Sequence, residues 1–143
     1  MLPESHNHSL HFNDNRKIIV FKQKEESSKY IGNNNDRKIF YSYKPDVMFS
    51  NKGEACDFLL YSENIVYFIE IKGSDILKAV DQITNSYKLY KEYFTDFSIN
   101  ARIIPTRGNT LVVNNTKYIR FKKMIKELNG TVITKEKVIE EDI

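Results

Sequence analysis

Asp57, Glu70 and Lys72 have the side-chain types and the spacing to carry out metal-dependent chemistry. Glu70-Ile71-Lys72 closes an apolar run, and twelve residues separate Asp57 from Glu70. Carboxylate oxygens are the ligands that hard divalent cations prefer, and a neighbouring lysine can supply positive charge to a reacting anion. These residues therefore predict a divalent-metal site, provided that the fold brings them together.

A β-hairpin is the local structure that would do so. Two apolar, β-forming segments, 55–61 and 65–72, flank a polar stretch in which residues 63–64 can form a two-residue turn. In that register Asp57 lies opposite Glu70. Directly opposed residues point to the same face, with Cβ atoms about 5 Å apart. The three charged side chains are thus expected to gather at the open end of the hairpin.

Both faces of this hairpin are expected to be covered, as in a central α/β sheet, because both are apolar. The face without the acids carries Cys56, Phe58, Leu60, Ile65, Tyr67, Ile69 and Ile71, and the face with them carries Leu59, Tyr61, Val66 and Phe68. Charges at the end of a buried strand pair are costly unless they are compensated. A bound cation would compensate them, and a salt bridge between Lys72 and one acid is the alternative that needs no metal.

A helix is predicted directly after the hairpin. Its apolar residues recur every three or four positions: Ile76, Val80, Ile83, Tyr87, Tyr90 and Phe94. Ser74 or Asp75 can cap its first turn. Gln82 lies off the apolar stripe, two turns from the acids. It is either close enough to orient a water or a phosphate, or a plain surface glutamine.

The remaining pattern predicts one α/β domain over residues 16–134, between a flexible tail (1–15) and a charged tail (135–143). Further strands are expected at 16–21, 37–43, 99–105, 110–114 and 131–134. A second helix is expected from about Lys117 to Asn129, with Gly130 as its stop. The polar stretch after the first strand is expected to be a short helix or a loop.

Asp57, Glu70-Ile71-Lys72 and a following helix with Gln82 together resemble the PD-(D/E)XK nuclease superfamily over roughly residues 55–94. The resemblance implies a restriction-endonuclease-like core, with a mixed central β-sheet flanked by helices, and Mg²⁺-dependent hydrolysis of DNA or RNA. Asp57, Glu70 and the Ile71 carbonyl would hold Mg²⁺ or Mn²⁺, with Lys72 and Gln82 beside the reacting water and phosphate. The sequence departs from the pattern at Cys56, where the family often has proline, and this thiol is expected to be a small core residue.

Other acids and histidines are weaker candidates for metal ligands. Asp46 follows a proline but lies 24 residues before Glu70, so it is expected in a turn entering residues 47–49 rather than in the site. Glu25 or Glu26 could add an auxiliary ligand, with solvated surface as the alternative. The predicted N-terminal tail contains three histidines that could bind a metal loosely, although a disordered tail is the simpler interpretation: His6, His8 and His11.

The charge distribution suggests a nucleic-acid partner, with DNA as the first candidate. The whole chain carries 22 basic and 19 acidic residues, but the segment from Asn100 to Gly130 contains seven basic residues and one acidic residue. Such a local excess predicts contacts with a phosphate backbone, and a solvated helix face is the alternative. The basic residues are Arg102, Arg107, Lys117, Arg120, Lys122, Lys123 and Lys126.

Length and composition fit this hypothesis. With 143 residues, 41% of them apolar, the chain can bury a core, and a single cysteine fits a reducing cytoplasm. No apolar run reaches transmembrane length, so no membrane association is expected. The alternatives are a non-catalytic nucleic-acid-binding or assembly subunit, and a structure-selective endonuclease similar to Holliday-junction resolvases. A homodimer and a subunit of a larger complex both stay open.

Overall fold

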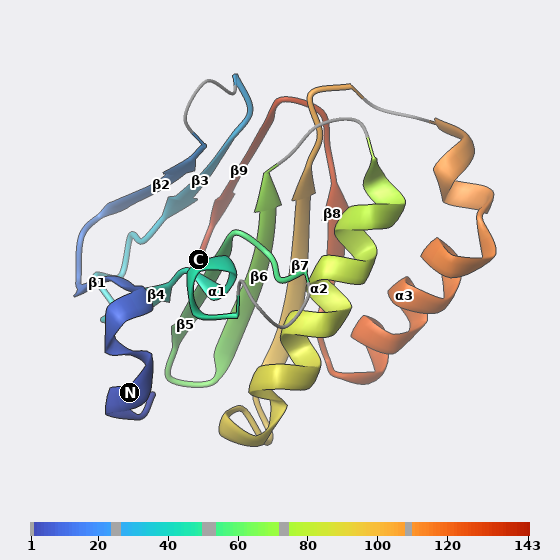
Figure 1. The fold of residues 1–143 in the computed structure, drawn as a ribbon. Coiled ribbons are helices and arrows are strands. Elements are labelled where there is room, and N and C mark those ends of the chain that lie inside the picture. Colours follow the sequence, from blue (N-terminus) through green and yellow to red (C-terminus); the bar gives the residue numbers. More distant parts are fainter. Residues whose placement is uncertain (1, 24–26, 50–53, 72–74, 108–109) are drawn as a thin grey trace.

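The computed structural model describes residues 2–23, 27–49, 54–71, 75–107 and 110–143, which form two β-sheets and a helical layer (Figure 1). Across the larger sheet the strands are β1 (Leu10–Asp14), β4 (Phe40–Tyr43), β5 (Phe58–Ser62), β6 (Ile65–Ile71), β7 (Ser98–Ile104) and β8 (Val132–Thr134). The smaller sheet consists of β2 (Ile18–Lys22), β3 (Lys29–Asn33) and β9 (Val138–Asp142). The helices are α1 (Pro45–Met48), α2 (Ile76–Tyr90) and α3 (Thr116–Glu127), and short 3₁₀ segments are η1 (Glu4–Ser9), η2 (Lys91–Tyr93) and η3 (Thr110–Asn114).

The larger sheet is mixed, as predicted. β1, β4, β5 and β6 are antiparallel neighbours, whereas β6, β7 and β8 run parallel. Parallel neighbours need crossover connections, and α2 and α3 supply them, after β6 and after β7 respectively. The chain is therefore an α/β protein with a mixed six-stranded sheet, a three-stranded sheet and flanking helices.

The hairpin of β5 and β6 has the predicted register. Ser62 pairs with Ile65 and Phe58 with Ile69, around a two-residue turn. The ladder begins later than expected, because β5 starts at Phe58. Asp57 therefore lies in a bend just outside the ladder, and the site depends on how that bend directs its side chain.

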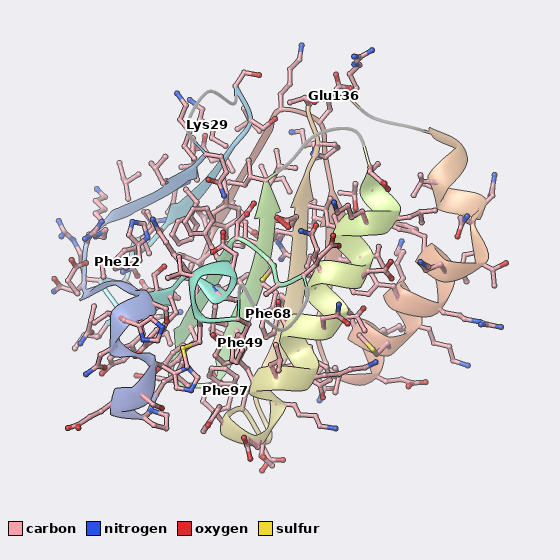
Figure 2. The ribbon with its side chains drawn as sticks, viewed as in Figure 1. Phe12, Lys29, Phe49, Phe68, Phe97 and Glu136 are labelled. Carbon is pink, nitrogen blue, oxygen red and sulfur yellow. The ribbon has the colours of Figure 1, made fainter. Side chains whose placement is uncertain are left out.

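The two faces of the hairpin pack against different layers (Figure 1). Leu59 and Phe68 join the core beneath α2 and α3, whereas Leu60 and Ile69 join the core shared with the three-stranded sheet. Figure 2 shows Phe68 between the sheet and α2, where its ring lies 6.4 Å from that of Tyr90. The side chains of the paired hairpin residues are thus covered either by the helices or by the three-stranded sheet.

Both long helices follow their predicted patterns. Asp75 caps α2 by accepting a hydrogen bond from the Lys78 N–H at 2.9 Å, and the apolar stripe of α2 packs on the sheet. α3 ends two residues before Asn129, which takes a positive φ of 61°. Gly130 is required next, because a Cβ there would lie 1.5 Å from the Ile99 carbonyl oxygen. None of the described helices combines the length and the apolar character needed to cross a bilayer.

The predicted tails are wrong for the described residues. The N-terminal segment forms η1 and β1 and places Leu2 and His6 in the interior. At the other end, β9 pairs in parallel with β3, a strand that was expected to be helix or loop. Each of these strands has little local signal and is stabilised by pairing with a distant segment, which a local pattern does not reveal.

The predicted strand at 110–114 is also wrong, since these residues form η3. A short apolar run fits a strand or one helical turn equally well. Here the turn leads into Asn115, whose side chain accepts a hydrogen bond from the Lys117 N–H at 2.8 Å and caps α3.

Candidate functional site

Asp57 and Glu70 lie on neighbouring segments at the end of β6 that leads into α2. Glu70 is the penultimate residue of β6 and is fully buried, while Asp57 is 6% exposed. The Ile71 N–H donates a hydrogen bond to Asp57 Oδ2 at 3.0 Å. This bond fixes one Asp57 oxygen on the strand that carries Glu70. The structure therefore brings the two predicted acids together, although Asp57 lies outside the strand ladder.

Asp46 joins these acids, contrary to the expectation that it stays apart from them. It lies on α1, a single turn that begins at Pro45, and its N–H donates to the Cys56 carbonyl at 3.2 Å. Partial burial, and next the charge on Asp57, raise the pKa of Asp46 above its ordinary value. α1 thus lies against the segment before β5 and places a third carboxylate beside Asp57, on the solvent-exposed side of the site.

Cys56 is a core residue, as predicted, but on the other face. It belongs to the core beneath α2, because the chain bends before β5 begins. Burial, and next the charge on Glu70, raise the pKa of its thiol well above the ordinary value. The thiol therefore stays protonated at neutral pH, and nucleophilic chemistry at Cys56 is disfavoured.

Ser86 links α2 to the segment before β5 that contains Asp57, and the sequence analysis did not identify it. The Cys56 N–H donates to Ser86 Oγ at 2.8 Å, and Ser86 Oγ donates to the Gln82 carbonyl at 2.8 Å. Gln82 itself is only 5% exposed, so it is not the plain surface glutamine that was the alternative. The sequence signal that could have identified Ser86 is its position, because residues 82 and 86 are four apart and so lie on the same face of the helix.

The predicted lysine and two of the auxiliary acids lie outside the described residues, namely Lys72, Glu25 and Glu26. Within the ranges that the structure describes, no three His, Cys, Asp or Glu side chains are grouped so that they could hold a metal ion. The candidate donor set is therefore Asp57, Glu70 and the Ile71 carbonyl, with Asp46 at its edge. All of these donors are oxygen atoms.

The histidines of the N-terminal segment do not converge on a common point. The His6 ring is buried against Tyr90, with ring centroids 5.6 Å apart. His11 lies beside Phe58 instead, at 5.8 Å. His8 is exposed on η1. These contacts explain why the segment is ordered: its aromatic and apolar side chains pack on the domain.

Arg102 is not part of a surface footprint, which corrects the prediction. It is 3% exposed, and its guanidinium forms two hydrogen bonds with the carboxylate of Glu141, at 2.6 and 3.0 Å. The same group also donates to the Thr131 carbonyl at 2.8 Å. A guanidinium that is buried and bonded in this way is a structural ion pair between β7 and β9 and has no free face for a phosphate.

The other predicted basic residues are exposed. Lys117 forms an ion pair of 3.0 Å with Asp81 of α2, which joins the two helices at the surface. Three lysines of α3 line a surface hollow beside β8: Lys122, Lys123 and Lys126. Arg107 follows β7, and Arg120 lies on α3. The basic surface therefore follows α3 and the segment after β7, whereas Arg102 points away from it into the interior.

The donor atoms of the acidic site have the chemistry that would suit a hard cation. Asp57 and Glu70 are both buried and both negative when ionised, and their repulsion falls when a cation binds between them. Oxygen donors suit Mg²⁺ or Mn²⁺ better than metals that prefer sulfur or nitrogen. In comparisons with known proteins, no family model, no curated protein and no solved structure matches this chain.

Proposed function

We propose that the chain is a metal-dependent nuclease that hydrolyses phosphodiester bonds, with DNA as its first candidate substrate. The observation that supports this most is the hydrogen bond from the Ile71 N–H to Asp57 Oδ2 at 3.0 Å. It holds one buried acid against the strand position next to a second buried acid, Glu70. Two carboxylates at the end of a strand pair could hold a divalent cation of the kind that such hydrolysis uses.

The order of the elements also favours this function. A β5–β6 hairpin carries the acids, and α2 follows directly and crosses to the parallel strand β7. We propose that this part of the chain is a restriction-endonuclease-like core, as the resemblance to the PD-(D/E)XK superfamily implies. The three-stranded sheet on the opposite face lies outside this resemblance.

The residues fit a divalent cation by their chemistry. Asp57, Glu70 and the Ile71 carbonyl would hold it, and Asp46 lies close enough to Asp57 for their charges to interact. When bound, Mg²⁺ or Mn²⁺ would lower the pKa of a coordinated water and neutralise charge on the reacting phosphate. The three carboxylates would in turn set a net negative charge that favours a cation over an anion at this position.

The protein's own residues then prepare the reaction. The Ile71 N–H donates to one oxygen of Asp57, and the other oxygen would serve as the ligand. Lys72 would orient the attacking water or place positive charge beside the phosphate oxygens. Gln82, which is buried on α2, would orient the same water or phosphate. Ser86 would hold α2 in place for this role through its bond to the Cys56 N–H.

Substrate binding is assigned to the exposed basic residues of α3 and to Arg107. Contacts between these side chains and phosphates would release counterions and make binding sensitive to salt. Such contacts are independent of sequence, and so small a domain leaves little surface for reading bases. Weakly specific or structure-selective cutting is therefore the expected mode.

The test uses supercoiled plasmid, single-stranded DNA and single-stranded RNA, each in Mg²⁺, Mn²⁺ or EDTA. We expect wild-type protein to cut at least one substrate only with metal present, and the Glu70→Ala variant not to cut. Glu63→Ala is the matched control, because Glu63 is exposed in the turn at the other end of the same hairpin. A folded wild-type protein that binds nucleic acid and never cuts would support the non-catalytic alternative instead.

A second comparison tests the resolvase-like alternative. Four-way junctions and linear duplexes of the same sequence are offered to wild-type protein under the conditions that give cleavage. A strong preference for the junction would support a structure-selective enzyme. Equal cutting of both would exclude it.

A further inference from the structure

β2 presents an unusually apolar edge to solvent. Its residues alternate, with Ile19 and Phe21 in the core and Ile18 and Val20 exposed to 56% and 49% respectively. Among the described strands β2 pairs with β3 alone, so it forms one edge of the three-stranded sheet (Figure 1). Two apolar side chains on a free edge strand form a surface that another strand could cover.

The backbone groups of β2 are also directed for pairing. In the ladder with β3, Ile18 lies opposite Asn33, and the Asn34 N–H donates to the Lys17 carbonyl at 2.7 Å. Lys17 therefore bonds toward β3. Because bonding direction alternates along an antiparallel strand, the N–H and C=O groups of Ile18, Val20 and Lys22 point away from β3. The residues with exposed side chains are thus also the ones with outward hydrogen-bonding groups.

The other sheet edges in the described structure carry features that hinder pairing. β1 has a register irregularity between Leu10 and Phe12. β8 has only three residues and lies beside a hollow lined by three lysines of α3. β9 ends in consecutive acidic residues, one of which binds Arg102. Natural proteins protect sheet edges by such means, whereas β2 is regularly paired over all five of its residues.

We propose that β2 pairs with β2 of a second copy of this chain, antiparallel about a two-fold axis at Val20. The two three-stranded sheets then form one continuous sheet of six strands. Val20 lies opposite Val20 of the second copy, and Ile18 lies opposite Lys22 of the second copy. Every outward N–H and C=O group of these three residues finds a partner in this register, and the contact is self-complementary, as a two-fold interface requires.

Neighbouring registers are less favourable. An axis at Lys22 places two lysines directly opposite each other, and like charges in that position repel. An axis at Ile18 leaves the outward groups of Lys22 without a strand partner. With the axis at Val20, the methylene groups of Lys22 cover Ile18. On the inner side, Ile19 then lies next to Phe21 of the second copy, and the two cores become continuous.

Charge substitution at the axis tests the proposal. Sedimentation over a range of concentrations is expected to show a dimer for wild type, and monomers for Val20→Lys and for Val20→Glu. Because residue 20 faces itself, mixing the two variants is expected to restore a dimer. Ile39→Lys, at an equally exposed apolar residue outside β2, is expected to stay dimeric. Circular dichroism confirms that each variant is folded.

Cysteine cross-linking tests the register. Cα atoms of directly opposed residues are about 5.5 Å apart, within reach of a disulfide. Oxidation is therefore expected to link Val20→Cys into dimers, since the native Cys56 is buried. Ile18→Cys is expected not to link, because the two copies of residue 18 would be about 13 Å apart. A monomeric wild type at every concentration, or no dimer on mixing the charge variants, would overturn the proposal, and cross-linking at residue 18 would overturn its register. All of these readouts are independent of nuclease activity.

Discussion

Two buried charged sites in this protein are built in opposite ways. Arg102 and Glu141 form a pair of opposite charges, with their atoms 2.6 Å apart and further bonds to backbone oxygen atoms. At the end of β6, by contrast, Asp57 and Glu70 are two neighbouring buried acids that carry the same charge when ionised. Asp46 lies close enough to Asp57 for their charges to interact. The first site lies on the side of the three-stranded sheet, and the second lies where α2 begins.

This difference separates a structural role from a functional one. An ion pair with its hydrogen bonds made is complete and needs nothing from outside the protein. Neighbouring carboxylates repel one another when they are ionised, and a cation beside them lowers that repulsion; in the proposed mechanism a bound metal and Lys72 would act in this way. We therefore infer that the first site maintains the fold and that the second site carries the chemistry. The predictions below test this division.

The largest expected effect concerns activity at the acidic site. Replacing Lys72 with alanine should reduce the cleavage rate more than about 100-fold, because the positive charge beside the phosphate is lost. The fold and nucleic-acid binding should be retained. The measurement is single-turnover cleavage, with gel-shift binding and circular dichroism as controls. A variant that cuts at the wild-type rate would show that the proposed mechanism is wrong.

The next largest effect concerns stability at the ion pair. Arg102→Ala should lower the free energy of unfolding by about 3 kcal/mol, because Glu141 then loses its partner in a partly buried position. Arg120→Ala, at an exposed site on α3, should change it by less than about 0.5 kcal/mol. Urea unfolding measures both. If Arg102→Ala were as stable as wild type and bound nucleic acid more weakly, Arg102 would belong to the binding surface after all.

A smaller effect is expected at the link between α2 and the site. Ser86→Ala should cost about 1–2 kcal/mol of stability, because the buried Cys56 N–H loses its acceptor. It should also lower the cleavage rate, since α2 would no longer hold Gln82 in place. Thermal unfolding and cleavage are measured on the same sample. Ser86→Thr keeps a hydroxyl and serves as the control that separates the lost hydrogen bond from the lost volume.

The smallest expected effect is a change in stability at Asp57. The sign of this change distinguishes the acidic site from the Arg102–Glu141 ion pair. Asp57→Asn keeps an oxygen that can accept from the Ile71 N–H but removes one of the neighbouring negative charges. In EDTA this variant should be as stable as wild type or more stable, by up to about 1 kcal/mol, as often occurs when a functional site is relaxed. Addition of Mn²⁺ should stabilise wild type and not the variant. A loss of stability as large as that of Arg102→Ala would mean that the acids are structural.

The parts of the fold that depend on local sequence could be predicted. Alternating apolar residues around a two-residue turn predicted the β5–β6 register, and the spacing of apolar residues predicted α2. Arg102 could have been placed correctly from the same alternation, because it lies in a predicted strand and shares the face of Ile104, which is buried. Its basic character favours the surface, whereas its position in the strand favours the interior.

The parts that depend on distant pairing could not be predicted. β1 pairs with β4, and β9 pairs with β3, over separations that no local pattern spans. Asp46 is too far from Glu70 in the sequence for a hairpin to join them, yet its N–H donates a hydrogen bond to the Cys56 carbonyl beside Asp57. Ser86 carries no signature of its own, since a serine on a helix face has many roles. These contacts form only when the whole chain is packed.

Cleavage by wild type and the Glu70→Gln variant, measured side by side on a supercoiled plasmid in Mg²⁺ and in EDTA, tests the central claim most directly. The substitution keeps the shape of the side chain and removes its charge. We predict that wild type cuts in Mg²⁺ and not in EDTA, and that Glu70→Gln cuts in neither. Equal cutting by both proteins, or cutting by wild type in EDTA, would contradict the assignment of Asp57 and Glu70 as a metal-dependent nuclease site.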